Sequence, residues 1–289
     1  MSAQFGPAGN AESFSKVHKS SLAAPAWIAR QGLDCYEYQC GKGVHVGEDT
    51  ARKLGEKARE AGIALSVHAP YFINLANPDP ESRAKTTNYV LESCFVAQVM
   101  GAERIVIHSG ALMKRSRQEA LDIAKETLKQ VLEACDRQGY GNITLCPETM
   151  GKINQLGDLD EVLTLCTLDE RLIPCIDFGH LYARSLGELE GEQACREILD
   201  KVERVLGEER ASRFHSHFSR IEFTPNGGEK RHRTFADHGG FGPDWTPLAR
   251  EVARRGWSPT FICESAGTQA EDAVEMKRIY QGFCSSEEA

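Results

Sequence analysis

The sequence predicts a (β/α)8 TIM barrel of the α/β class, formed by a single domain over residues 1–289. Three observations lead to this prediction. Short apolar segments alternate with longer amphipathic segments along the whole chain. There are eight short segments, which is the number of strands in such a barrel. The chain length also suits one barrel, because α/β barrels commonly reach this size as one domain.

The eight strand candidates are short and consist mostly of apolar or β-branched residues. Segments of this kind fit strands that are buried on both faces of a parallel sheet. In chain order they are Ala3–Gly6, Leu33–Gln39, Ile63–His68, Arg104–His108, Asn142–Glu148, Ile173–Asp177, Phe214–Glu222 and Thr260–Glu264.

The intervals between these segments show helical periodicity, most clearly from Ser116 to Gln138. Its apolar residues fall on one stripe, Ser116 and Glu119 fit a capping box, and Gly139 follows where a helix would end. Similar patterns cover Leu22–Arg30, Thr50–Ala61, Ser82–Met100, Asp158–Cys166, Glu192–Leu206, Trp245–Arg255 and Glu271–Tyr280. A doubly wound open sheet would also alternate in this way. However, no GxGxxG or GxxxxGK[ST] motif follows the first strand to support its nucleotide-binding version.

Composition narrows the classes of function. The net charge of −8 argues against broad electrostatic binding to nucleic acid, although Lys230–Arg233 is a local basic stretch. The ten cysteines are scattered without a CxxC pair, which indicates reduced core thiols in a cytoplasmic protein. Neither a signal peptide nor a stretch of ~20 apolar residues is present, so no membrane association is expected. The ends, Met1–Ala3 and Cys284–Ala289, are expected to be loose.

Residue types that bind metals recur where six consecutive predicted strands end. They are His68, His108, Glu148, Asp177, His217 and Glu264, and His180 follows Asp177 by three residues. A single such residue is usually a helix cap or a hydrogen-bonded structural group. The carboxyl ends of barrel strands all open on one face, however, so these side chains are expected to converge there.

This ligand set predicts a metal centre. Zinc suits mixed imidazole and carboxylate ligands, and manganese or iron could also be bound by them. Six or more ligands exceed the need of one tetrahedral zinc ion, which favours a cluster of at least two ions. A carboxylate such as Glu148 could bridge them, and paired metals suit phosphoester hydrolysis.

These segments resemble the endonuclease IV family, zinc-dependent apurinic/apyrimidinic endonucleases with a barrel of the xylose-isomerase type. The densest similarity runs from His68 to Gly110, and the segments PETMG, IDFGH and the closing ES follow in the same order. The resemblance implies a hydrolase of DNA base excision repair that cleaves duplex DNA on the 5′ side of abasic sites. Its cofactors would be two or three zinc ions, with manganese as the alternative metal.

Residue by residue, the resemblance implies three metal positions. His68, His108 and Glu148 would bind the first zinc, and Glu148 would bridge it to a second. The second would also be bound by Asp177, His217 and Glu264, and a third by His180 and His232. Glu148 and Glu264 would serve catalysis through the metals that they bind.

One position departs from the family pattern. The family's third zinc also takes an Asp two residues before the last His, where this sequence has Lys230. Glu229 lies three residues before His232 and could substitute for that Asp. Tyr71 and Asn74, in the segment APYFINLA, are the substrate-binding candidates, since the family uses a Tyr of this loop to enter the DNA stack. An aromatic lid over the barrel mouth is the alternative for Tyr71.

Two other functions remain open. A sugar isomerase or epimerase on the same barrel needs one divalent ion, which Glu148, Asp177, His217 and Glu264 could bind. A barrel that binds a sugar or nucleic acid as a sensor is the non-catalytic alternative. His215 shares a strand face with His217, and we interpret it as structural. The protein is expected to act as a monomer.

Overall fold

The computed structural model describes residues 2–286 and confirms the TIM barrel. Eight parallel strands form the barrel wall: β1 (Gln4–Pro7), β2 (Cys35–Gln39), β3 (Ala64–His68), β4 (Arg104–His108), β5 (Thr144–Glu148), β6 (Cys175–Asp177), β7 (His215–Phe218) and β10 (Thr260–Cys263). Their order is β1-β10-β7-β6-β5-β4-β3-β2, and every ladder within it is parallel. β1 and β2 approach at the ends of this order, where Asp34 N donates to Phe5 O at 2.8 Å and Gly9 N to Glu37 O at 2.9 Å.

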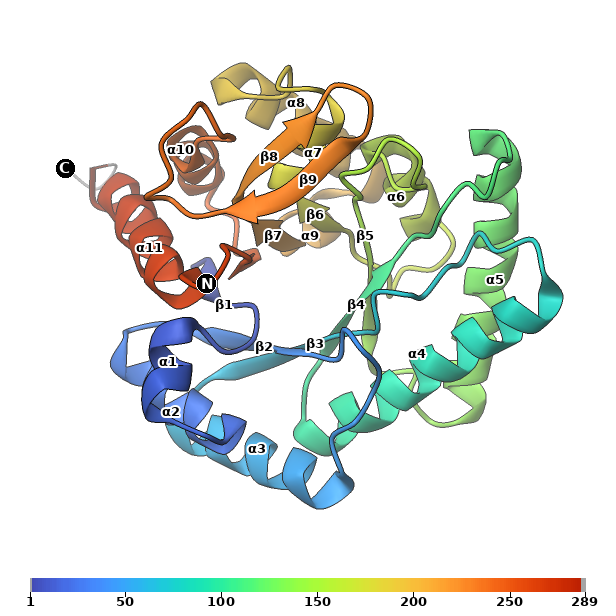
Figure 1. The fold of residues 1–289 in the computed structure, drawn as a ribbon, viewed down its shortest axis with the longest axis horizontal. Helices are drawn as coiled ribbons and strands as arrows, with labels where there is room; N and C mark the ends of the chain where they lie inside the picture. Colours follow the sequence, from blue (N-terminus) through green and yellow to red (C-terminus); the bar gives the residue numbers. More distant parts are fainter. Residues whose placement is uncertain (1, 287–289) are drawn as a thin grey trace.

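Helices surround this wall in chain order (Figure 1). They are α1 (Glu12–Val17), α2 (Ala24–Arg30), α3 (Glu48–Ala61), α4 (Pro80–Met100), α5 (Arg117–Arg137), α6 (Leu159–Cys166), α7 (Phe178–Arg184), α8 (Gly191–Leu206), α9 (Glu208–Ala211), α10 (Trp245–Arg255) and α11 (Gln269–Ser286), with a 3-10 turn η1 (Ser21–Ala23) before α2. Among the described helices, none is both long and apolar enough to cross a membrane.

Local sequence explains where α5 and α6 begin. The predicted capping box of α5 is present, because the Ser116 side chain accepts from Glu119 N and Glu119 reaches back to Ser116 N. α6 begins with the same device at Asp158 and Glu161. These caps fix the first turns of helices that pack against the barrel wall.

The barrel core is apolar where wall and helices meet. Phe5, Trp245 and Phe261 are completely or almost completely buried there and contact one another edge to face or stacked. β1 lies beside α11, and Ala3 N donates to Tyr280 Oη. The prediction of loose ends is therefore wrong for Ala3, which is buried, and for Cys284, which lies in α11; Met1 and residues 287–289 are outside the described residues.

One predicted strand is two strands. The segment Phe214–Glu222 leaves the barrel after Phe218, and β8 (Arg220–Thr224) pairs with β9 (Gly228–Arg233) as an antiparallel hairpin (Figure 1). The sequence pattern gave no sign of this break, because the apolar Ile221 of β8 continues the strand pattern. Its side chain is buried, as it would be in a barrel strand. The basic stretch Lys230–Arg233 therefore belongs to a strand, and this hairpin rather than the barrel wall supplies His232.

Candidate metal centre

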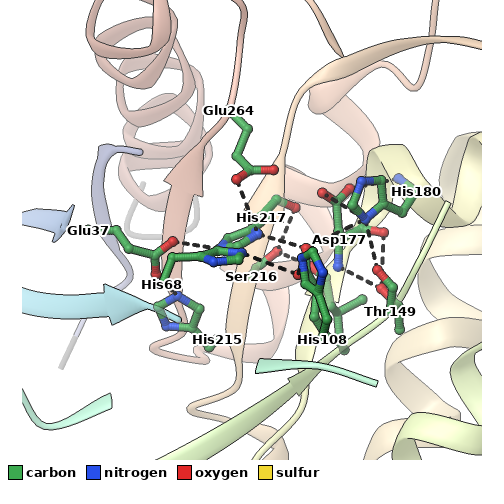
Figure 2. A network of polar contacts seen from close by, with 12 residues as sticks. Glu37, His68, His108, Thr149, Asp177, His180, His215, Ser216, His217 and Glu264 are labelled. Carbon is green, nitrogen blue, oxygen red and sulfur yellow. Dashed lines mark hydrogen bonds and ion pairs between the residues drawn. The ribbon is translucent and has the colours of Figure 1, made fainter. Parts of the chain in front are cut away.

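The predicted strand-end residues converge at the carboxyl end of the barrel. His68, His108, Glu148 and Asp177 are the last residues of β3, β4, β5 and β6, and Glu264 directly follows β10. His217 lies inside β7, one residue before its end. Figure 2 shows the side chains from these different strands pointing toward one another.

Glu148 is the centre of this cluster, with four imidazoles around one buried carboxylate. Its Oε1 lies 3.0 Å from His217 Nδ1 and 3.5 Å from His180 Nδ1. Its Oε2 lies 3.2 Å from His108 Nε2 and 3.5 Å from His68 Nε2. A carboxylate whose two oxygens face different pairs of imidazoles has the geometry of a bridging ligand.

A second group of side chains lies beside it. Asp177 caps α7 by accepting from His180 N at 2.7 Å, and this cap turns the His180 ring back toward the barrel mouth. His180 Nε2 lies 3.5 Å from Glu229 Oε2, and His232 lies 3.9 Å from both Glu229 and Glu264. The β8–β9 hairpin thus brings Glu229 and His232 to His180.

The cluster suits a metal ion because some of its buried carboxylate oxygens have no hydrogen-bond donor. Three overlapping groups have ligand atoms close enough to share an ion: His68, Glu148 and His217; Glu148, Asp177, His217 and Glu264; and His180, His232 and Glu264. Glu148 Oε2 and Asp177 Oδ2 are buried and accept no hydrogen bond. Buried oxygens without a hydrogen-bond partner are costly, and a divalent cation would compensate them.

The electrostatics agree with an affinity for cations. Burial disfavours charge on His68, but Glu148 beside it raises the pKa of His68 to about 8. Burial has the same effect on His180, yet Asp177 and Glu229 raise its pKa to about 9. Burial raises the pKa of Asp177, more than its His180 neighbour lowers it. Without metals, the His68 and His180 imidazoles therefore carry protons at neutral pH.

The other predicted residues lie near this mouth in different roles. Tyr71 is 55% exposed and lines the same cavity of about 320 Å³ as His68 and Glu264. Asn74 is turned inward, where its Oδ1 accepts from Ala76 N at 3.1 Å and Ala111 N at 3.0 Å, so it connects two mouth loops. Lys152 is a cation at the cavity that the sequence did not single out.

The basic stretch is largely neutralised within the hairpin. Lys230, Arg231 and Arg233 all pair with the Glu222 carboxylate, with Arg231 Nε at 3.0 Å. The hydrogen bonds from these three side chains lower the pKa of Glu222 to about 2. Because Glu222 neutralises part of their charge, these three side chains are less suited to bind an anion such as a phosphate.

Sequence reasoning missed Glu37, in the middle of β2. Its side chain is 0% exposed inside the barrel, with Oε1 2.9 Å from His217 Nε2 and Oε2 2.9 Å from His215 Nε2. The signal was a charged residue in the middle of a predicted barrel strand, since charged side chains are almost never fully buried unless paired. His215, interpreted as structural from the sequence, faces Glu37 and lies away from the open mouth.

The protein is therefore a TIM barrel with a cluster of metal-ligand residues at the carboxyl ends of its strands. The chain matches the xylose isomerase-like TIM barrel family over residues 25–280 and belongs to that family.

Among curated relatives, the uncharacterized protein MJ0133 of Methanocaldococcus jannaschii is 34% identical over 88% of this chain and 89% of its own length. A probable endonuclease 4 of Acholeplasma laidlawii is 33% identical, but over only 43% of this chain and 44% of that protein.

Solved structures share the fold at low identity. A D-tagatose 3-epimerase-like protein is 19% identical with a TM-score of 0.68, covering 89% of this chain and 91% of its own. Endonuclease IV from Thermus thermophilus is also 19% identical, with a TM-score of 0.65 over 93% and 95% of the two chains. These likenesses support the barrel alone, so the function has to be inferred from the side chains.

Proposed function

We propose that this protein is a hydrolase of phosphoester bonds that uses two or three divalent ions, as the endonuclease IV family does. The substrate to test first is duplex DNA with an abasic site, cleaved on its 5′ side. Zinc is the proposed metal, and manganese is the alternative.

The observation that favours this function is the group His180, Glu229 and His232. A barrel that uses one ion needs only the four residues Glu148, Asp177, His217 and Glu264. Here a hairpin that follows β7 brings two more ligand-type side chains to the cluster, with Glu229 3.5 Å from His180 and His232 3.9 Å from Glu264. This sequence lacks the family's Asp, and the carboxylate of Glu229 beside His180 and His232 would supply the acidic ligand of the third position instead.

Bound divalent ions would supply Lewis-acid stabilisation of a phosphoryl oxygen and would lower the pKa of an attacking water. The chain's own groups orient this chemistry. Glu148 would hold two metal positions at a fixed spacing, and burial of the cluster limits competing solvent. Lys152 at the cavity would bind a phosphate oxygen, while exposed Tyr71 would contact an unstacked base or sugar.

The decisive assay uses metal-loaded protein and a labelled duplex with one synthetic abasic site. The proposal predicts a single incision, loss of incision with chelator, and restoration by zinc or manganese. An undamaged duplex and the Glu148→Gln variant are the negative controls. No incision under any of these metal conditions would reject the abasic-site activity.

A sugar isomerase or epimerase is the second candidate, and a specific observation favours it. Glu148, Asp177, His217 and Glu264 have ligand atoms close enough to bind one ion by themselves. Glu148 and Glu264 also line a cavity of about 320 Å³, the size of a small-molecule site. The excess of acidic residues also suits a small sugar better than a polyanion. Turnover of ketohexoses with one ion bound per chain would support this candidate over hydrolysis.

A further inference from the structure

The most unusual buried group outside the mouth is the Glu37 carboxylate, which lies deeper in the barrel than the metal cluster. It is fully buried and interacts with four side chains from three strands, of which Figure 2 shows His215 and His217 beside it. Its Oε2 accepts from His215 Nε2 and from Ser66 Oγ, both at 2.9 Å. Its Oε1 accepts from His217 Nε2 at 2.9 Å and from Gln39 Nε2 at 3.2 Å.

His217 thus lies between two carboxylates that face its two ring nitrogens. Nδ1 points to the mouth, 3.0 Å from Glu148 Oε1 and 3.6 Å from Glu264 Oε1. Nε2 points inward to Glu37. A neutral imidazole has one proton, and the nitrogen that keeps it cannot bind a metal.

We infer that Glu37 is a positioning residue for the metal centre, because it keeps the proton of His217 on Nε2 and leaves Nδ1 as the ligand atom. It also fixes the plane of the ring, since the hydrogen bond at Nε2 and the contacts at Nδ1 lie on opposite sides. Glu37 does not touch the mouth cavity, so its effect on a metal or substrate passes through His217. Carboxylates that bind the far nitrogen of a ligand histidine commonly have this effect.

His215 and Cys175 are the competing partners in this region. His215, Cys175 and His217 have ligand atoms close enough to share an ion. However, the Nε2 atoms of both histidines are bonded to Glu37. An ion here would have to use His215 Nδ1, which is buried without a hydrogen-bond partner, and His217 Nδ1, which already faces Glu148. The geometry therefore favours one function for this inner group, as a buried support whose hydrogen bonds orient His217.

The first test measures metal affinity in the full-length Glu37→Gln variant. Metal-free protein is titrated with zinc in competition with a chromophoric chelator, and bound zinc is counted by elemental analysis. The expected result is a ~10–100-fold weaker Kd for the site that contains His217. Glu251→Gln, a buried Glu on α10 that pairs with Arg255, is the matched control and is expected to retain wild-type zinc affinity.

The second test observes the proton on His217 Nε2 directly by NMR. In zinc-loaded wild-type protein with labelled imidazole nitrogens, His217 should show a downfield, slowly exchanging proton on Nε2. This resonance should be absent in a His217→Gln variant, which assigns it, and shifted in Glu37→Asp, which keeps a carboxylate but shortens its reach. If Glu37→Gln does not fold, Glu37→Asp supplies both readouts.

The outcomes separate this inference from the proposed function on which it rests. If wild-type protein binds no divalent ion, the metal centre is rejected and the role of Glu37 with it. If wild-type protein binds zinc and the Glu37 variants bind it equally tightly with an unchanged His217 resonance, only the role of Glu37 is rejected. Weaker zinc binding with a shifted resonance supports the inference, whichever substrate the protein uses.

Discussion

Replacing Glu148 by Gln should destabilise the metal-free protein, and the loss should depend on pH. The carboxylate lies 3.0–3.5 Å from His217, His108, His68 and His180. Near pH 6.5, His68 and His180, with pKa values of about 8 and about 9, are mainly charged. Removing one partner of a buried ion pair costs ~3–5 kcal/mol. For a chain of this length, this corresponds to a lowering of Tm by ~6–10 °C at about 2 °C per kcal/mol.

The assay is urea unfolding of chelator-treated protein at pH 6.5 and at pH 9.5. At the higher pH the charge on His68 and His180 is mostly lost, so the cost of Glu148→Gln should fall. It should not fall to the ~1 kcal/mol of a lost hydrogen bond, because the acidic groups around buried His217 hold its pKa well above the usual value and keep this pair charged. Glu251→Gln, whose partners are arginines, should cost the same at both values of pH. An equal loss for Glu148→Gln at pH 6.5 and pH 9.5 would show that the charges of His68 and His180 do not stabilise the Glu148 carboxylate.

Four further predictions concern this cluster and the barrel mouth beside it. The wild-type metal-free protein should lose stability between pH ~6.5 and ~9, because the folded-state pKa values of His68 and His180 exceed the unfolded value of ~6.5 and the folded protein binds more protons; denaturant midpoints that rise over this range would contradict the pairing. Glu229→Gln should remove about one bound ion and leave the others, as measured by elemental analysis; a full wild-type metal content would exclude Glu229 as a ligand. Gly151→Ala should act similarly, since its Cβ would lie 2.7 Å from Glu229 Cβ and 2.9 Å from His180 Cδ2. Tyr71→Ala, at an exposed side chain, should change stability by less than ~0.5 kcal/mol yet lower kcat/KM on abasic duplex, and unchanged kinetics would remove Tyr71 from the substrate surface.

The barrel and most of the metal-ligand cluster could be predicted from sequence, because each strand is a short apolar run whose end is visible in the sequence. His68, His108, Glu148 and Asp177 each close a short apolar run, and a parallel barrel brings such ends to one face. The capping box at Ser116 was equally readable, since both of its partners are local in sequence.

Sequence could not reveal the contacts that depend on long-range geometry. The hairpin after β7 continues the apolar pattern through Ile221, so a break at Phe218 left no local sign. The position of Glu229 beside His180 depends on that hairpin. Glu37 was missed for a similar reason, because its partners His215 and His217 lie about 180 residues away in sequence.

The number of metal ions bound per chain decides whether the barrel holds a multinuclear centre. Full-length protein, purified without chelators and dialysed against metal-free buffer, is analysed for bound zinc, manganese and iron per chain. We expect two or three ions, with about one fewer in Glu229→Gln and the greatest loss in Glu148→Gln. A single ion in the wild-type protein would contradict the multinuclear centre and favour sugar chemistry, and the absence of bound metal even after zinc is supplied would contradict the metal centre altogether.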